Sequence, residues 1–319
     1  DLVRSRGLGD VYKRQLRNKR LVAEPPSTLM ATRRMLTLGG FGLASPVVNS
    51  IQSLAWVRPG ISSLKCWVSI MGMASGMAKQ GLRPVAAIYS SFLQRAYDQL
   101  IHDTALSDLH VVFAVDRAGM VGADGETHHG IFDATFLSEI PNMTVLCPSN
   151  FAELRTMLDR AVNEIKGPVA IRYPRGGEGN YKEDSGRQNL VVLREGEDIT
   201  LCAYGTMINN VLGAAEILHE QGIEARVVKI NAISPLYDRD MREVIGKTKA
   251  MLVAEECAGV GCMGQRMAAI LGWNKISPER LELCNLGKAF PAQGTVEELY
   301  REFGLDAESL AKKAAEVLR

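Results

Sequence analysis

Four short apolar stretches decide the fold: PVAAIY (84–89), VVFAV (111–115), TVLC (144–147) and PVAIRY (168–173). Each is apolar on both faces, which is typical of strands in a parallel sheet that is covered on both sides. Between them, residues 92–106 and 151–165 place apolar side chains at helical spacing, and Asn150 with Glu153 predicts a capping box before the second helix. The alternation of strands and helices predicts an α/β domain.

A second domain of the same kind is expected beyond a polar linker at residues 176–190. Its predicted strands lie near residues 198–204, 225–230, 250–255 and 281–286. We place the first domain at residues 72–180 and the second at residues 191–319, without a sequence repeat between them. The predicted fold class is therefore α/β, with two tandem domains built on mainly parallel sheets.

Residues 1–71 are expected to form an irregular or artefactual segment outside both domains. No Asp or Glu lies between Glu24 and Asp98, although 36 of the 319 residues are acidic. The opening DLVRSRGLGDVYKRQ resembles translated sequencing-adapter read-through, so we hypothesise that it is not natural protein and that much of residues 22–70 is out of frame. A basic, acid-poor start is also found in organelle transit peptides, an alternative that we rank lower.

Composition argues against several classes of protein. With 46% hydrophobic and 23% charged residues, and no run near the ~18 apolar residues of a membrane span, we expect a globular protein that does not enter a membrane. The formal charge of +1 provides no general field for nucleic acids. Six cysteines without a CxxC pair indicate buried thiols and a cytoplasmic location. Cys257 and Cys262 are at most a metal candidate, and we predict no metal site.

Polar side chains follow the strands of the first domain, where parallel α/β sheets bind their ligands. The first strand ends at Tyr89 and leads to Arg95. The second leads through a glycine-rich loop to Asp124 and His128, and PVAIRY leads to Arg175. Guanidinium groups bind phosphate through paired hydrogen bonds, and a histidine with a pKa near ~6.5 transfers protons at neutral pH. This set predicts a site for a small phosphorylated substrate.

Each of these residues also has a structural interpretation. An arginine after a strand is most often ion-paired or solvated, and Tyr89 could belong to the core. One of the adjacent His128 and His129 is expected to make structural hydrogen bonds. Glu255 and Glu256 could form a catalytic carboxylate pair, but adjacent residues on a strand face opposite ways, so we expect structural roles for both.

Four longer runs contain these residues in a family-like order: AIYSSFLQRAYDQLIHD (87–103), VFAVDRAGMVGADGETHHGIFD (112–133), IPNMTVLCPS (140–149) and GPVAIRYPRG (167–176). Their sequences and spacing closely resemble those of the 1-deoxy-D-xylulose-5-phosphate synthase family, over roughly residues 72–319. The resemblance implies the thiamine diphosphate-binding fold, with a pyrimidine-binding domain first and a transketolase C-terminal domain at residues 191–319. The second domain would then serve mostly as a scaffold.

The resemblance also implies an activity. Members of this family are transferases that condense pyruvate with D-glyceraldehyde 3-phosphate to 1-deoxy-D-xylulose 5-phosphate, with loss of CO2. The product feeds isoprenoid, thiamine and pyridoxal synthesis. The implied cofactors are thiamine diphosphate and Mg²⁺, the partners are small-molecule substrates, and the intact enzyme would be a homodimer.

The resemblance assigns roles to the candidate residues. Phe92 would be the aromatic platform for the aminopyrimidine ring of the cofactor. Arg95 and Arg175 would clamp the phosphate and hydroxyl groups of the aldehyde substrate, which Tyr89, Asp124 and His128 would also contact. His128 would relay protons as the catalytic residue, and Asp124 would hold a substrate hydroxyl or orient that histidine.

Two features of the family are missing from the sequence. The family uses a glutamate to protonate the aminopyrimidine, and counting back without gaps places Trp67 or a neighbour at its position, in the stretch CWVSIMG (66–72) that has no carboxylate. The GDG motif of the family's N-terminal domain, which holds the magnesium, is also absent. We therefore expect this chain to be a fragment that is inactive alone.

Two other classes of protein remain as alternatives. One is the β-type subunit of a split transketolase or of a ketoacid dehydrogenase, which has this length and domain order. Two motifs argue against the dehydrogenase: FLQRAYDQ (92–99) and HHGIFD (128–133). The other is a non-catalytic interaction protein, because a fold by itself does not establish an activity.

Overall fold

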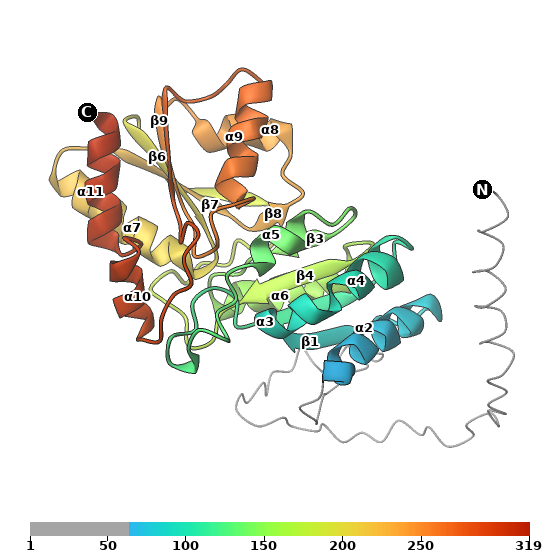
Figure 1. The fold of residues 1–319 in the computed structure, drawn as a ribbon. Helices are drawn as coiled ribbons and strands as arrows, with labels where there is room; N and C mark the ends of the chain where they lie inside the picture. Colours follow the sequence, from blue (N-terminus) through green and yellow to red (C-terminus); the bar gives the residue numbers. More distant parts are fainter. Residues whose placement is uncertain (1–63) are drawn as a thin grey trace, which may run out of the picture. The chain divides into compact units, whose positions relative to one another are not determined.

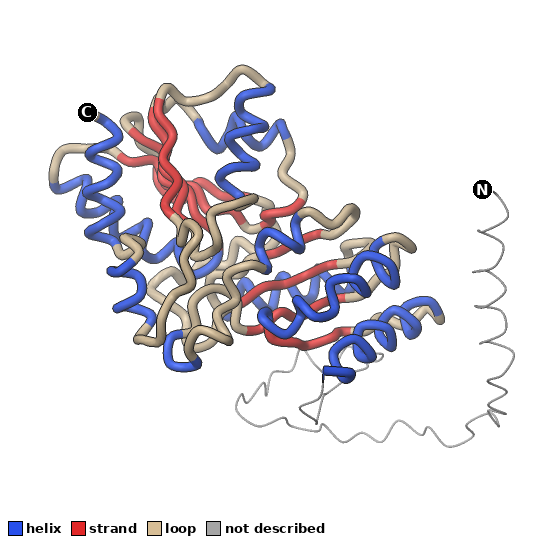
Figure 2. The backbone as a smooth tube through the Cα atoms, in the orientation of Figure 1, coloured by secondary structure: helices blue, strands red, loops and turns tan. Residues whose placement is uncertain are grey.

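The computed structural model describes residues 64–319. All of the described residues belong to one compact unit. The expectations for residues 1–63 lie outside the described residues. Within residues 64–319 two five-stranded sheets follow one another along the chain (Figures 1 and 2), which confirms the predicted fold class.

The first sheet has the strand order β1-β2-β4-β3-β8. Its parallel strands coincide with the four predicted stretches: β1 (Val85–Tyr89), β2 (Val112–Asp116), β3 (Thr144–Leu146) and β4 (Val169–Tyr173). The register pairs Tyr89 with Asp116, and Asp116 with Tyr173. Three strands therefore end at the same level, and the residues that follow them share one edge.

The helical segments of the first domain begin earlier than expected. Helix α2 (Leu64–Lys79) includes residues 64–71, so the expectation of irregular structure up to residue 71 is wrong for this stretch. Its buried apolar residues include Ile70, Met71 and Ala74, at a helical spacing that we did not predict. The helix forms because this face packs into the core.

The predicted helix at 92–106 is a succession of short helices instead of a single one. It runs through α3 (Ser90–Leu93), the 3₁₀ turn η2 (Gln94–Ala96), α4 (Tyr97–Gln99) and the π-helical η3 (Leu100–Ala105). Ala96 separates the pieces, because its φ of −112° and ψ of 19° leave the α-helical region. The first of these pieces starts directly at the end of β1.

Two further helices complete the first domain. These are α5 (Asp133–Ser138) and α6 (Phe151–Asn163). Asn150 caps α6 as predicted, because its side chain accepts a hydrogen bond from the Glu153 amide. The reciprocal half of the box differs, since the Glu153 carboxylate accepts from the Ser149 amide, 2.8 Å away, one residue before the cap.

The second sheet has the order β10-β9-β6-β7-β5. Its parallel strands are β6 (Ile199–Tyr204), β7 (Ala225–Ile230), β9 (Ala250–Ala254) and β10 (Arg280–Cys284). Helices α7 (Ile208–Glu220) and α11 (Ala307–Leu318) cover one face, and α8 (Asp238–Ile245) and α9 (Met263–Trp273) cover the other (Figure 1). The other helical elements are α10 (Val296–Glu302), η4 (Gly122–Asp124) and η5 (Gly205–Met207).

Two antiparallel strands were not predicted. Strand β5 (Leu190–Arg194) pairs with β7 at the end of the expected linker. Strand β8 (Ala232–Ser234) follows β7 along the chain but pairs with β3 of the first sheet. The second half of the chain thus completes the first sheet, and one buried cluster contains residues of both sheets, such as Phe113 and Val253.

Candidate active site at the carboxyl edge of the first sheet

The candidate site lies where β1, β2 and β4 end. Tyr89 is the last residue of β1, Arg117 directly follows β2, and Arg175 lies two residues beyond β4. The loop after β2 returns Asp124 to the same edge through the turn η4. Ligands of α/β sheets bind at this edge because side chains there extend beyond the packed layers.

Two arginines converge on one carboxylate at this edge. Asp124 accepts a hydrogen bond from the Arg117 Nε, 3.0 Å away, and pairs with the Arg175 guanidinium through its other oxygen. Arg117 also pairs with Asp116, 2.7 Å from its Nη1. Burial by itself would raise the pKa of Asp124, but the two guanidinium groups hold that pKa below its usual range. Asp124 is therefore negatively charged, and its carboxylate pairs with both arginine side chains.

Arg117 takes an unusual backbone conformation to reach this position. Its φ is 62°, in the left-handed region that non-glycine residues seldom adopt. Its guanidinium carbon lies 3.7 Å from the centre of the Tyr89 ring, which it covers as a cation–π partner. A strained backbone persists where surrounding contacts hold the residue in place, and such residues cluster at functional sites. We therefore include Arg117 in the candidate site.

Aromatic rings surround Phe92 on α3. Its ring centre lies 5.3 Å from that of Tyr89, at an interplanar angle of 27°, and 5.2 Å from that of Trp67 on α2. The His128 ring meets it edge-on at 5.5 Å. The guanidinium carbon of Arg95, which is exposed to solvent, lies 5.9 Å from the Phe92 ring centre.

The two adjacent histidines have different surroundings. His129 is buried; its Nδ1 accepts from the Val121 amide at 3.1 Å, so Nε2 carries the proton donated to the Ala292 carbonyl, also at 3.1 Å. These contacts identify His129 as the structural histidine. His128 is partly exposed, and its Nδ1 lies 2.9 Å from the Thr127 hydroxyl.

The structure brings every predicted site residue into one connected group. Contacts run from Arg95 through Phe92 to Tyr89 and His128, and from Tyr89 through Arg117 to Asp124 and Arg175. Sequence reasoning missed Arg117 and Trp67 as members. The place of Arg117 directly after a strand was a usable signal, whereas nothing in the sequence showed that Trp67 would contact Phe92.

Glu255 and Glu256, for which we expected structural roles, both accept hydrogen bonds from backbone amides. The Glu255 carboxylate accepts from the Met263 and Gly264 amides, at 2.9 and 2.8 Å, at the start of α9. Glu256 accepts instead from the Met120 amide at 3.1 Å. Both residues lie just beyond β9, not on it, and their carboxylates bond to different segments of the chain.

The group fits part of what a thiamine cofactor would require. The Phe92 ring, with its neighbours, is an aromatic surface suited to a flat heterocycle. The described helix α2 has no carboxylate in its sequence, and its Trp67 side chain contacts that surface. Among residues 64–319 no group of three or more His, Cys, Asp or Glu side chains could hold a metal ion. The described residues therefore fit stacking of the ring but not its protonation from α2, nor the binding of a metal.

Comparison with known protein families identifies two domains. The model of the transketolase pyrimidine-binding domain matches residues 68–178, and that of the transketolase C-terminal domain matches residues 188–310. None of the described helices has both the length and the apolar character needed to span a membrane.

Individual relatives point to the same family. The chain is 43% identical over 253 residues to a 1-deoxy-D-xylulose-5-phosphate synthase of Chlorobium luteolum, covering 77% of this chain and 40% of the relative. It is 44% identical over 250 residues to the enzyme of the same name from Chlorobaculum tepidum, covering 76% and 39%. The chain thus spans about two fifths of the length of these curated relatives.

Solved structures share the fold. A structure described as a split gene transketolase, inactive beta4 tetramer, matches with a TM-score of 0.71 at 29% identity, covering 82% of this chain and 83% of that one. A transketolase from Pichia stipitis matches with a TM-score of 0.67 at 19% identity, covering 79% and 36%, which is a likeness of fold alone. The chain therefore belongs to the transketolase family, of which it carries a pyrimidine-binding domain followed by a C-terminal domain.

Proposed function

We propose that this chain forms the acceptor-binding part of a thiamine diphosphate-dependent transferase that joins pyruvate to D-glyceraldehyde 3-phosphate. The product is 1-deoxy-D-xylulose 5-phosphate, and CO2 is lost. The identity to curated synthases of that name supports this reaction. In the same proposal the enzyme acts in the cytoplasm as a homodimer on small molecules and uses Mg²⁺ held by residues other than those described.

The observation that carries the proposal is the convergence of Arg117 and Arg175 on Asp124. A phosphate dianion can replace a carboxylate as the partner of a guanidinium group, because both accept paired hydrogen bonds. An arriving aldehyde phosphate would exchange with Asp124 at the exposed Arg175, and Asp124 would then accept from a substrate hydroxyl. Arg95, exposed beside Phe92, would supply a second cation for the phosphate.

The remaining residues orient and transfer protons. Phe92 would hold the flat ring of the cofactor, which supplies an electron sink for the carbon chemistry. The Nδ1 of His128 is engaged by Thr127, so Nε2 is the nitrogen that would exchange a proton with the acceptor. No step is assigned to α2, where Trp67 occupies the position expected for an acid.

A second candidate is the β-type subunit of a split transketolase. The observation that favours it is the near-equal coverage of this chain and the split-gene transketolase, 82% and 83%. Such a subunit would obtain its metal ligands from a separate chain that carries the missing domain, and it would also need the glutamate restored at the position on α2. Co-purification of an α-type chain from the source organism would favour this form.

The proposal is tested by binding, which does not require turnover. The full chain is titrated calorimetrically with D-glyceraldehyde 3-phosphate and, in parallel, with D-glyceraldehyde, which lacks the phosphate. We expect the phosphate to strengthen binding by at least about tenfold, and Arg175→Ala to remove most of this difference. The control Arg187→Ala removes another exposed arginine, which pairs with Glu164 away from the site, and should change nothing. Equal binding of the two aldehydes by the unaltered chain would refute the assignment of this edge.

A further inference from the structure

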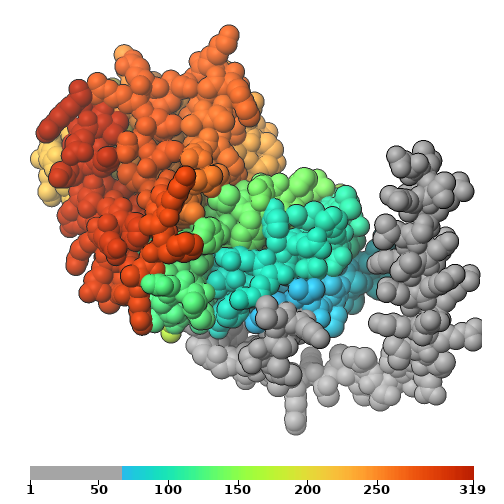
Figure 3. Space-filling model, in the orientation of Figure 1, coloured from blue at the N-terminus to red at the C-terminus, as the bar shows by residue number. Residues whose placement is uncertain are grey.

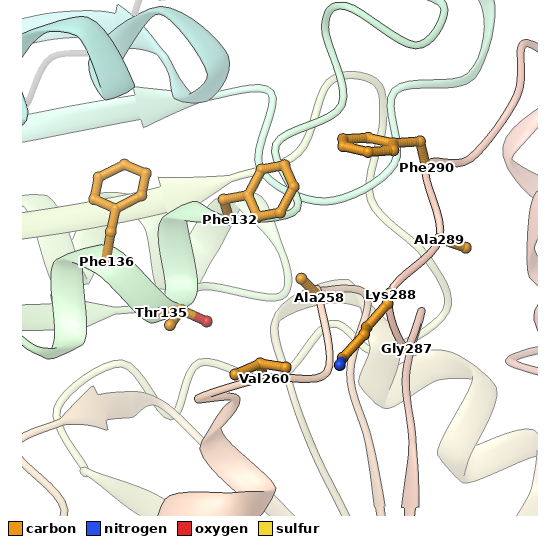
Figure 4. Close-up of a pocket in the computed structure, with 9 residues that line it drawn as sticks. All are labelled: Phe132, Thr135, Phe136, Ala258, Val260, Gly287, Lys288, Ala289 and Phe290. Carbon is orange, nitrogen blue, oxygen red and sulfur yellow. The ribbon is translucent and has the colours of Figure 1, made fainter.

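A cavity of about 400 Å³ lies between α5 and two loops of the second domain, and none of the residues of the candidate site line it (Figure 4). Three phenylalanine rings line one side of it: Phe132, Phe136 and Phe290. Val260 and Ala258 lie across from them. Volume and lining are those of pockets that bind small organic molecules.

Two polar groups inside this apolar cavity have no partner among the described residues. The Thr135 hydroxyl is buried and makes no hydrogen bond. Lys288 also lines the cavity, is exposed, and has no acidic partner within residues 64–319. In Figure 4 the Thr135 hydroxyl points toward the space bordered by Ala258 and Val260, and the Lys288 ammonium group lies toward that same space. A buried hydroxyl without a partner is costly, so a ligand atom at this place would be stabilised.

The lining contains one cation and no carboxylate. A ligand would therefore gain from one negatively charged end beside Lys288 and Thr135, and from an apolar, preferably aromatic, body against the phenylalanine rings. We propose that this cavity is a binding site for an amphipathic organic anion with a flat apolar body and a single carboxylate, sulfonate or phosphate group.

The walls of the cavity are held in place by backbone hydrogen bonds. The Ala258 amide donates to the Ile131 carbonyl at 2.9 Å, which joins the second domain to the start of α5. The Gly259 amide donates to the Gly287 carbonyl at 2.7 Å, which joins the two loops. A Cβ at Gly259 would come within 2.7 Å of the Asn285 amide oxygen and 3.2 Å of the Gly287 Cα, so the two loops approach closely here. A site that is already shaped loses less entropy on binding.

A small molecule fits this cavity better than a second copy of the chain. A stable protein interface buries roughly 800 Å² on each partner and has several large apolar side chains at its centre. Of the residues that line the cavity, Val260 and Phe290 are the large apolar ones that are exposed, at 62% and 74%. Two such side chains around a concave pocket suit a ligand with a compact body.

The test uses two fluorescent probes with nearly the same apolar body. 8-Anilinonaphthalene-1-sulfonate has a negative charge, and N-phenyl-1-naphthylamine has none. We expect the full chain to bind one equivalent of the sulfonate at least about tenfold more tightly than the amine. Lys288→Ala should remove most of this preference while leaving the amine unchanged, and Lys288→Arg should keep it. Lys166→Ala removes an exposed lysine after α6 and should have no effect.

Two more variants separate the cavity from unspecific binding. Thr135→Val keeps the shape of the side chain but removes the hydroxyl, and should weaken the sulfonate about threefold or more. Phe290→Ala should weaken both probes alike. Equal binding of the two probes by the unaltered chain, or a sulfonate affinity unchanged by Lys288→Ala, would overturn the proposal. A third outcome would also overturn it: the unaltered chain is assembled and does not bind the probe, and Phe290→Glu converts it into monomers. The cavity would then be an interface between copies.

Discussion

Replacing Glu153 by glutamine should destabilise the protein by roughly 3–5 kcal/mol, which is the usual cost of removing one partner of a buried ion pair. The Glu153 carboxylate lies 2.9 Å from the Lys229 ammonium group, and neither side chain has any exposed surface. The carboxylate also accepts from the Ser149 amide at 2.8 Å and from the Ser185 hydroxyl at 2.6 Å. Asn231 is the other hydrogen-bond partner of the ammonium group. Glutamine keeps one acceptor oxygen, so it preserves at most one of the two serine bonds, and it leaves the ammonium charge buried without compensation.

A double-mutant cycle isolates the pair. Lys229→Met should cost about 3 kcal/mol, at the low end of the range, because Glu153 keeps its two serine donors. The double variant carries neither charge, so it should lie within about 2 kcal/mol of the parent and above both single variants in stability. Urea unfolding of the four chains, followed by circular dichroism, measures the free energies of unfolding. Additive losses in the double variant would refute the reasoning.

The same variant has a pH signature. Burial lowers the pKa of the Lys229 ammonium group, although Glu153 opposes the effect. Removing the Glu153 charge should lower it further. For a base whose pKa is lower in the folded state, the penalty is complete below that folded pKa and is relieved as the pH rises toward the unfolded value. The deficit of Glu153→Gln relative to the double variant should therefore shrink as the pH rises toward the ordinary pKa of lysine, and a deficit that stays constant would contradict this reasoning.

Two further predictions concern the candidate site. Asp124→Asn should strengthen calorimetric binding of inorganic phosphate several-fold at low salt, because it frees the guanidinium of Arg175 from a competing carboxylate; weaker binding would contradict the exchange that we propose. Gly119→Ala should cost more than about 2 kcal/mol, because its φ is +76° and a Cβ there would collide with the Glu256 carboxyl group. Gly76→Ala is the matched control; with nothing within 4 Å of its Cβ on helix α2, it should stabilise by up to about 1 kcal/mol in thermal unfolding.

The parts of the fold that follow a simple period could be predicted. The four parallel strands of the first sheet lie in mainly apolar runs, and the rule that ligands bind beyond such strands located Tyr89, Asp124 and Arg175. Strand β8 could not be found in this way, since three residues are too few to show alternation and its partner β3 lies some ninety residues earlier in the chain. Strand β5 borders a segment without periodicity that is held by the buried Asn231, whose amide donates to the Ser185 and Gln188 carbonyls.

Contacts between side chains that are far apart in sequence were beyond prediction as well. The sequence shows that Trp67 occupies the place where an acid was expected, but not that its ring lies 5.2 Å from that of Phe92. It shows Arg117 after a strand, but not the left-handed backbone that turns its guanidinium over Tyr89. The apolar cavity likewise combines three segments, around residues 135, 260 and 288, whose meeting depends on how the two sheets pack.

The second domain therefore contributes to the site by holding the loop that carries Asp124 and His128. The Ala123 carbonyl accepts from the Gln293 amide group at 3.1 Å, and the adjacent His129 is bonded to the Ala292 carbonyl. In the space-filling view (Figure 3) the orange-red residues that follow β10 meet the green residues of this loop. Because little of the loop is regular structure, these bonds from the second domain fix its conformation. The second domain, which contains none of the candidate site residues, thus helps to set the geometry in which Asp124 meets its two arginines.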